Sequence, residues 1–166
     1  MDGYRECAGI VLFNDDGKVL MCARADQNGY AWQFPQGGIE KGEKPEDAAL
    51  RELKEETSVT SAEIILSLAE PVSYLFPKAV YTKFLKNGTA YVGQNMHWFL
   101  IHFKGADDEI NLNTQTPEFK AYKWEDFKNA HKDIIYFKRK VYRKVCHLML
   151  PYMEAYVRHN KEENKM

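Results

Sequence analysis

The segment GGIEKGEKPEDAALRELKEETSV, residues 37–59, decides the fold that the sequence predicts. Its paired glycines indicate a loop, and Pro45 suits the first turn of a helix that we expect to run to about Thr57. Like charges at helical spacing repel each other, so a cluster of them on one face indicates a bound cation. Three glutamates have that spacing here: Glu52, Glu55 and Glu56.

A carboxylate cluster of this kind suits a hard divalent cation such as Mg²⁺ or Mn²⁺ better than zinc. The alternative is an acidic helix face exposed to solvent, with Arg51 and Lys54 as ion-pair partners. Apolar residues on the same helix would dock it onto a sheet. They are Ala48, Ala49, Leu50 and Leu53.

The composition of the whole chain narrows the class of protein. A length of 166 residues predicts one domain with a sizeable core. The formal net charge is −1, so a nucleic-acid partner would need a local basic patch. Three scattered cysteines without a CxxC pair argue against disulfides and structural zinc. We find no apolar run of about 20 residues and no room for a signal peptide, and therefore expect a cytosolic protein without a membrane span.

Periodic segments along the chain predict the remaining elements. Strands are expected at residues 8–13, 18–24, 62–68, 81–85, 96–103 and 119–124, and residues 32–34 form a short apolar segment before Pro35. A closing helix is expected from Lys138 to Arg158, with a kink at Pro151. One domain would then span residues 1–158, and residues 159–166 would form a frayed tail. These elements predict an α+β fold, an α/β/α sandwich around a mixed sheet.

The spacing within residues 37–59 resembles the conserved box of the Nudix hydrolases. Gly37 is followed after five residues by Glu43 and after seven more by RELKEETSV, so every charged position of the box is matched. Ser58 departs from the pattern, because the family usually has glycine there to form a left-handed helix cap. Serine adopts that backbone conformation at a cost on the order of 1 kcal/mol.

The resemblance implies roles for the matching residues. Glu43 and Arg51 would form a charge pair that braces the glycine loop against the helix. Family members cleave a nucleoside diphosphate linked to another group, with water attacking phosphorus and metal ions neutralising the phosphate oxygens. A glutamate takes the proton, and the choice among Glu52, Glu56 and Glu118 stays open. The implied metal ligands are the carboxylates of Glu52, Glu55 and Glu56 and a backbone carbonyl of Gly37 or Gly38.

Segments outside the box resemble one subgroup, which joins RNA 5′-pyrophosphohydrolases with dinucleoside polyphosphate hydrolases. The resemblance spans residues 3–145 and implies the fold of the family, with its catalytic helix after a glycine-rich loop. The matching segments are GYR at 3–5, WQFPQGG at 32–38, SYLFP at 73–77, GQ at 93–94, EINL at 109–112, PEF at 117–119 and FKRKVY at 137–142.

These segments supply further candidate residues. Glu118 would be an additional metal ligand, the alternative being a surface glutamate at a strand end. Tyr74 and Phe137 would sandwich a nucleobase, which contributes about 1–3 kcal/mol per base, the alternative being core packing. Cationic side chains would grip phosphates, unless they are ordinary surface charges. The complete set of candidates for substrate binding is Arg5, Arg24, Tyr74, Gln94, Ile135, Tyr136, Phe137 and Lys138.

The resemblance thus implies a metal-dependent enzyme that cleaves a phosphoanhydride at the 5′ end of tri- or diphosphorylated RNA, leaves a 5′-monophosphate and initiates RNA decay. Dinucleoside polyphosphates such as diadenosine tetraphosphate are the alternative substrates. A more distant alternative is a non-catalytic RNA-binding module. The basic and aromatic run at 132–144 would contact the phosphate backbone, unless it is a solvated helix face. We expect a monomer, although the sequence does not fix the oligomeric state.

Overall fold

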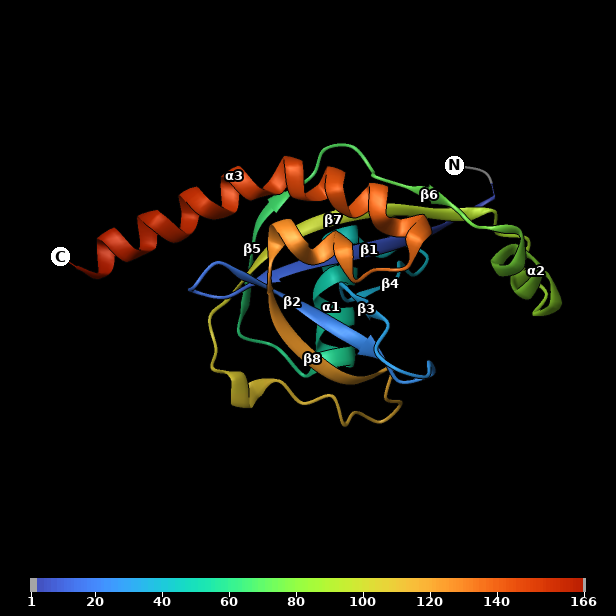
Figure 1. Ribbon diagram of the computed structural model, residues 1–166, viewed down its shortest axis with the longest axis horizontal. Coiled ribbons are helices and arrows are strands. Elements are labelled where there is room, and N and C mark those ends of the chain that lie inside the picture. The colour runs from blue at the N-terminus through green and yellow to red at the C-terminus, as the bar shows by residue number, and fades with distance from the viewer. Residues whose placement is uncertain (1–2, 166) are drawn as a thin grey trace.

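The structure is a computed structural model that describes residues 3–165 (Figure 1). Its strands are β1 (Tyr4–Phe13), β2 (Lys18–Arg24), β3 (Trp32–Gln33), β4 (Gln36–Gly38), β5 (Ala62–Ser67), β6 (Tyr74–Leu75), β7 (Gly93–Phe103) and β8 (Phe119–Asp126). Its α-helices are α1 (Pro45–Thr57), α2 (Lys78–Lys86) and α3 (Arg139–Asn164). Short 3₁₀ helices are η1 (Asp107–Glu109), η2 (Phe127–Lys132) and η3 (Tyr136–Lys138).

The strands form one mixed sheet. β1 runs parallel to β7 over its whole length, and the other pairings are antiparallel. The order along the sheet is β3-β2-β1-β7-β5, with β8 beside β2 and β6 beside β7. β4 pairs with the middle of β1, which brings the paired glycines to the centre of the sheet.

Two separate apolar cores cover the two faces of this sheet. Alternate residues of a strand point to opposite faces, and the central strands are buried on both. Val11 and Trp98 belong to the core shared with α3, whereas Ile10 and Phe99 belong to the core shared with α1. Figure 1 shows α3 across one face of the sheet and α1 behind it. The predicted α/β/α sandwich around a mixed sheet is therefore confirmed.

One predicted strand is wrong. Residues 81–85 lie in α2, which follows directly after Pro77. The short run YTKFL is part of a helical pattern, because Val80, Phe84 and Asn87 recur at helical spacing and all line one cavity. The remaining predicted strands are present, with ends that differ by a few residues.

The closing helix is longer than expected. Residues 159–164 continue α3, so the predicted frayed tail is wrong for this segment. His159 Nε2 lies 3.1 Å from Glu163 Oε1, a contact at i,i+4 spacing that supports a surface helix. Pro151 lies within α3. Residues 1, 2 and 166 of the expected domain and tail lie outside the described residues, and the division of the chain into one domain stays a prediction.

Candidate active site

The pairing of β4 with β1 places the glycine loop against α1. A Cβ atom on Gly37 would lie 2.0 Å from Cδ of Glu52 and 2.2 Å from its Oε2. Real Cβ contacts are never that short, so only glycine allows the Glu52 carboxylate to lie against this backbone. The loop and the helix therefore meet at the predicted carboxylates.

The end of α1 is fixed as the sequence predicted. Ser58 adopts a left-handed conformation, with φ 68°, and its N–H donates to the carbonyl of Lys54 at 2.9 Å. Its hydroxyl also donates to the carbonyl of Asn111 at 2.8 Å. This second bond ties the helix end to the segment before β8 and offsets part of the backbone cost of serine at this position.

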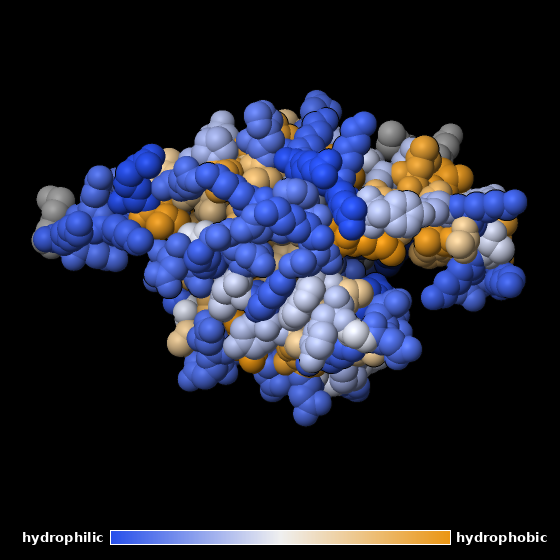
Figure 2. Space-filling model, viewed as in Figure 1, coloured by the Kyte–Doolittle hydropathy of each residue, from blue (hydrophilic) through white to orange (hydrophobic). Residues whose placement is uncertain are grey.

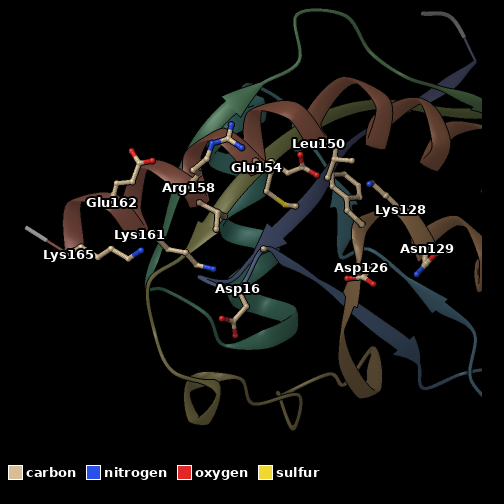
Figure 3. A pocket seen from close by; sticks show the side chains of 14 residues that line it. Asp16, Asp126, Lys128, Asn129, Leu150, Glu154, Arg158, Lys161, Glu162 and Lys165 are labelled. Carbon is tan, nitrogen blue, oxygen red and sulfur yellow. The ribbon is translucent and has the colours of Figure 1, made fainter.

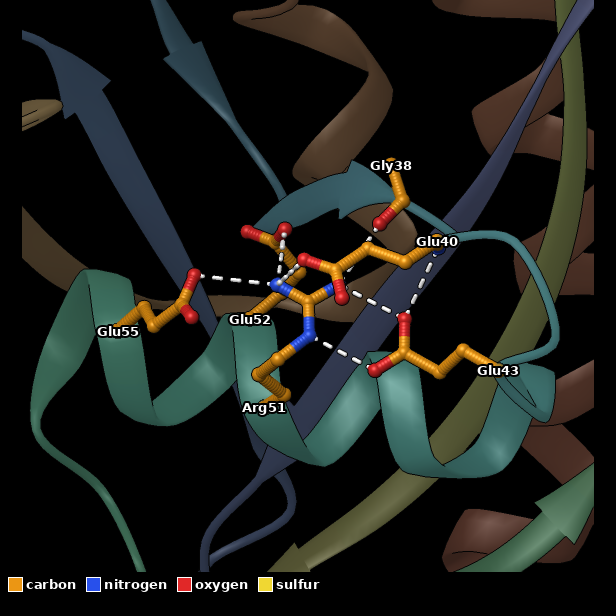
Figure 4. Close-up of polar contacts among 6 residues, drawn as sticks. All are labelled: Gly38, Glu40, Glu43, Arg51, Glu52 and Glu55. Atoms are coloured by element: carbon orange, nitrogen blue, oxygen red, sulfur yellow. Dashed lines mark hydrogen bonds and ion pairs between the residues drawn. The ribbon is translucent and has the colours of Figure 1, made fainter.

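Arg51 connects the loop to the acidic face of α1 (Figure 4). Its guanidinium donates to both carboxylate oxygens of Glu43, at 2.8 and 2.9 Å, and to the carbonyl of Gly38 at 2.9 Å. It also donates to Glu52 at 2.9 Å and to Glu55 at 3.1 Å. Hydrogen bonding to Arg51 lowers the pKa of Glu43 to about 2. The predicted contact between Glu43 and Arg51 is thus present.

A cavity of about 440 Å³ opens beside this loop, and it gathers most of the predicted site. Glu118 reaches it because the chain before β8 pairs with the end of β2, where the N–H of Ala25 donates to the carbonyl of Glu118 at 2.8 Å. The predicted metal ligands at the cavity are Gly37, Gly38, Glu52, Glu56 and Glu118. The predicted substrate-binding residues at the cavity are Arg5, Arg24 and Gln94.

Glu56 is in an unfavourable position for a carboxylate without a cation. It is 4% exposed, and its Oε2 has no hydrogen-bond partner among the described residues. Burial, together with the negative charges of Glu118 and Glu52, raises its pKa to about 10. Burial also raises the pKa of Glu52. A hard divalent cation would relieve both the burial and the repulsion, so the donor set fits such an ion.

Glu55 does not join the other two glutamates of α1, so the expectation that all three converge is wrong. Its side chain is 57% exposed, and Arg51, which lies between Glu52 and Glu55, binds it on the outer side. Within residues 3–165, no three carboxylate, histidine or cysteine side chains are arranged as a ready metal cage. The metal-binding roles of the individual residues therefore stay predictions.

Two cationic side chains, Arg5 and Arg24, also line this cavity, and a third, Lys138, lines an adjoining one. Arg5 lies against Gly38, where an added Cβ would be 2.8 Å from its Nη2. Arg24 is held by Asp26 through two bonds of 2.9 and 2.7 Å. Lys138 is 7% exposed and donates to Gln36 Oε1 at 3.4 Å. Burial, and secondarily the charge of Arg24, lowers the pKa of Lys138 to about 8. Lys138, a buried cation with no carboxylate bonded to it, suits an anionic ligand.

A second cavity of about 300 Å³ adjoins the first and is lined by aromatic side chains. We call it the aromatic cavity. Arg24, Gln36 and Gln94 border both cavities, so the two form one connected space. The aromatic side chains that line the second cavity are Trp32, Tyr74, Phe76, Phe84 and Phe137.

The expected sandwich of a base between Tyr74 and Phe137 is not open in this structure. Their ring centroids are 5.7 Å apart, whereas a base between two parallel rings needs about 7 Å, twice the carbon contact distance. Tyr74 is buried, and its hydroxyl bonds to Gln94 Oε1. Ile135 borders the aromatic cavity, but Tyr136 is 65% exposed and does not. The predicted position of Tyr136 is therefore wrong.

The sequence did not single out several residues that border these cavities. Gln33 and Gln36 lie in the matching segment WQFPQGG but were given no role, and Asp26 lies in no matching segment. Lys83 and Phe84 were missed because their helix was taken for a strand. Pro77 followed by apolar residues three and four apart was the signal for that helix.

The basic run at 132–144 is divided between the interior and the surface. Lys138 points inward, as described above, and Tyr142 is buried and accepts a bond from the N–H of Phe34 at 2.8 Å. The other basic residues of the run are exposed, namely Lys132, Arg139, Lys140, Arg143 and Lys144. The run therefore does not form one continuous binding surface.

A larger hollow, of about 710 Å³, lies beside the C-terminal half of α3 (Figure 3). None of the predicted site residues borders it. Its rim mixes both signs of charge: Asp16, Asp126 and Glu154 with Lys128, Arg158 and Lys161. The connected pair of cavities, and not this hollow, carries the chemistry that the sequence predicts.

The comparison with protein families agrees with this geometry. A model of the NUDIX domain matches residues 3–145, and the chain therefore belongs to the Nudix hydrolase family. The predicted family and fold are confirmed.

Particular members of the family are similar over most of the chain. The chain is 44% identical over 142 residues to the RNA pyrophosphohydrolase of Sphingopyxis alaskensis, a match covering 84% of this chain and 89% of the relative. It is 45% identical over 145 residues to the RNA pyrophosphohydrolase of Wolbachia sp. subsp. Brugia malayi, covering 87% and 88%. It is 41% identical over 148 residues to Nudix hydrolase 26, chloroplastic, of Arabidopsis thaliana, covering 87% and 68%.

Solved structures share the fold at lower identity. The E. coli dihydroneopterin triphosphate pyrophosphohydrolase matches with a TM-score of 0.61 at 21% identity, covering 85% of this chain and 95% of that one. A C. elegans Ap4A hydrolase binary complex matches with a TM-score of 0.59 at 22% identity, covering 87% and 98%. Among the helices of residues 3–165, none has the length and apolarity needed to cross a membrane. The expected cytosolic location stays a prediction.

Proposed function

We propose that this protein hydrolyses a phosphoanhydride at the 5′ end of tri- or diphosphorylated RNA and leaves a 5′-monophosphate. The observation that carries the proposal is the buried carboxylate of Glu56, whose Oε2 has no partner among the described residues, in a cavity that Arg5 and Arg24 also line. Such a site suits a polyphosphate held partly through divalent cations and partly by direct contacts. The names of the relatives support RNA as the substrate.

The proposed ion is Mg²⁺ or Mn²⁺. Glu52, Glu56 and Glu118 would hold it, together with a backbone carbonyl of Gly37 or Gly38. When bound, such an ion neutralises phosphate oxygens and lowers the pKa of a water molecule.

The side chains of the protein supply the remaining functions. Arg5, Arg24 and Lys138 bind phosphate oxygens in the connected space. Arg24 exchanges the Asp26 carboxylate for a phosphate, which offers the same paired oxygens. Arg51 orients Glu52, and one of the cavity glutamates accepts the proton of the attacking water. The first nucleoside occupies the aromatic cavity.

Dinucleoside polyphosphates are the second candidate substrates, because a nucleoside joined to a phosphate chain also fits an aromatic cavity connected to a polyphosphate site. A side-by-side assay separates the two. The purified protein is incubated with Mg²⁺ and either 5′-triphosphorylated RNA with an unpaired end or diadenosine tetraphosphate, with Glu56→Gln as the control. We expect the larger kcat/KM on RNA and a loss of orders of magnitude in the variant.

Three other outcomes contradict parts of the proposal. Preference for the dinucleotide would make the protein a dinucleoside polyphosphate hydrolase. RNA binding without Mg²⁺ and without cleavage of either substrate would favour a binding module. Near-normal turnover by Glu56→Gln would exclude that residue as a metal ligand or base.

A further inference from the structure

Helix α2 forms one wall of the connected cavities. Val80, Lys83, Phe84 and Asn87 line the aromatic cavity, and their spacing of three, four and seven residues places them on one face of the helix. Phe84 also borders the carboxylate cavity. The helix buries none of its residues and lies at the end of the molecule away from the C-terminus of α3 (Figure 1). Helix α2 therefore lines the cavities and adds no buried side chain to either core.

The cavity-facing side of α2 is held in place by aromatic packing. Phe84 stacks on Phe76, with ring centroids 4.9 Å apart and an interplanar angle of 8°, and meets the edge of Tyr91 at 6.0 Å. The hydroxyl of Thr89 donates to the carbonyl of Phe84 at 3.1 Å. Lys83, the neighbour of Phe84, is thereby positioned at the mouth of the aromatic cavity.

Lys83 differs from the other cations of the site. Arg24 is paired with Asp26 and Lys138 is buried, whereas Lys83 is exposed and forms no salt bridge with any residue between 3 and 165. Leu75, which precedes α2, and Leu85, which lies within it, are 63% and 46% exposed. Figure 2 shows apolar side chains at the end of the molecule that carries α2. The ammonium group of Lys83 thus lies at the mouth of the cavity, where it meets any part of a ligand that extends beyond the bound nucleoside.

We infer that Lys83 binds a phosphodiester of the RNA strand just downstream of the nucleoside held in the aromatic cavity. This inference rests on the proposed function. An RNA end continues as a chain, so it must leave through the cavity mouth and carry its next phosphates past Lys83. Contacts of this kind position the strand without reading its sequence. A mononucleotide has no such phosphodiester, and neither has a dinucleoside polyphosphate, so Lys83 favours RNA over both.

Binding of a product-like ligand tests this inference separately from catalysis. Fluorescence anisotropy with Mg²⁺ compares a 5′-monophosphorylated oligoribonucleotide with the corresponding mononucleotide as a competitor. The variants are Lys83→Ala, Lys83→Arg and the control Lys86→Ala, since Lys86 lies on the same helix but borders neither cavity.

Lys83→Ala should weaken binding of the oligonucleotide about two- to fivefold at low salt, as expected for an exposed ion pair. The slope of log K against log salt should fall by about 0.7, the value for one phosphate of a single strand. Mononucleotide binding should not change, Lys83→Arg should restore the affinity, and Lys86→Ala should behave like the wild type.

Equal oligonucleotide binding by Lys83→Ala and Lys86→Ala would overturn the inference, and so would an equal loss for the mononucleotide. The proposed function fails separately. If the wild type cleaves no triphosphorylated RNA but the binding pattern appears, the reaction is wrong and the Lys83 contact stands. If RNA is cleaved and Lys83→Ala matches Lys86→Ala in binding, the reaction stands and the Lys83 contact is wrong.

Discussion

Phe137 illustrates how a single side chain combines two functions. Its ring contacts Tyr74 and packs against the core shared with α3, and it also lines the aromatic cavity. Because the two rings touch, a base must either stack on the cavity side of Phe137 or separate the rings. In both arrangements Phe137 provides the aromatic surface, which is worth about 1–3 kcal/mol per stacked base.

Phe137→Ala should therefore raise KM for nucleotide substrates about tenfold and have less effect on inorganic polyphosphate, which has no base to stack. Steady-state kinetics on both substrates measures the difference. Tyr136→Ala is the matched control, because its ring is adjacent in sequence but does not border the cavity. An equal effect of Phe137→Ala on both substrates would mean that the ring acts only in the core.

At the scale of elements, α1 is defined at both ends by contacts with loops. Its last turn depends on the left-handed Ser58 and its bond to Asn111, and its first turn is held near the glycine loop by Glu43 and Arg51. These contacts fix the helix in rotation and along its axis. Glu52 and Glu56 consequently face the cavity, whereas Glu55 faces solvent.

The free-energy cost of a left-handed serine at the end of α1 can be measured separately from the effect of its hydroxyl bond. Ser58→Gly and Ser58→Ala both lose the hydroxyl bond to Asn111, but only alanine keeps a Cβ atom at φ 68°. Ser58→Gly should therefore be the more stable variant by about 1 kcal/mol, measured by urea unfolding. Equal unfolding free energies would show that the left-handed conformation is not retained in the variants.

Because of the ion pair between Glu43 and Arg51, we expect the free energy of unfolding to depend on pH. The pKa of Glu43 is about 2 in the folded protein and 4.5 for an unperturbed glutamate. A lowered pKa stabilises the folded state fully above the unfolded value and ceases to do so as pH falls through the folded value. The stability advantage of the wild type over Glu43→Gln should thus be full at pH 6, reduced at pH 3 and absent below pH 2. The measurement is the urea midpoint at each pH.

Glu46→Gln serves as the control for this pH dependence. Glu46 lies in the first turn of α1, is exposed and forms no salt bridge within residues 3–165. The stability difference between the wild type and Glu46→Gln should vary much less over the same range of pH. A constant difference between the wild type and Glu43→Gln would contradict the ion pair.

At the scale of the whole molecule, the site lies where elements from distant parts of the chain meet. β1 and β7 align the central sheet, β4 brings the glycine loop to α1, and the pairing of β8 with β2 adds Glu118. Repulsion among the buried carboxylates opposes this arrangement. A bound cation should therefore stabilise the entire fold, because it binds the folded state and not the unfolded chain.

Mg²⁺ or Mn²⁺ at about a hundred times its Kd should raise Tm by roughly 5–10 °C relative to EDTA. Glu56→Gln should lose this increase, since it removes a buried carboxylate of the cavity. Glu55→Gln should keep most of it, because Glu55 lies outside the cavity. Thermal unfolding with and without metal provides the comparison, and equal increases for both variants would refute the assignment of Glu56 as a ligand.

The sequence by itself determined the features that depend on neighbouring residues. The bounds of α1 follow from Pro45 and helical spacing. The contact of Glu43 with Arg51 and the left-handed cap at residue 58 follow from the resemblance to the Nudix box. The family follows from the same segment, and so does the sandwich fold that the family implies. These features are local because a helix fixes which side chains share a face within one or two turns.

Only the tertiary structure decided which of these side chains enter the site. Strand pairing, not spacing, brings Glu118 to Glu56, and Arg51 draws Glu55 outward. Packing closes Tyr74 onto Phe137, and α2, which contains residues 81–85, carries Lys83 and Phe84 to the cavity. The physical reason is that burial and long-range pairing depend on the whole fold, so the spacing of residues along the chain does not decide which side chains meet.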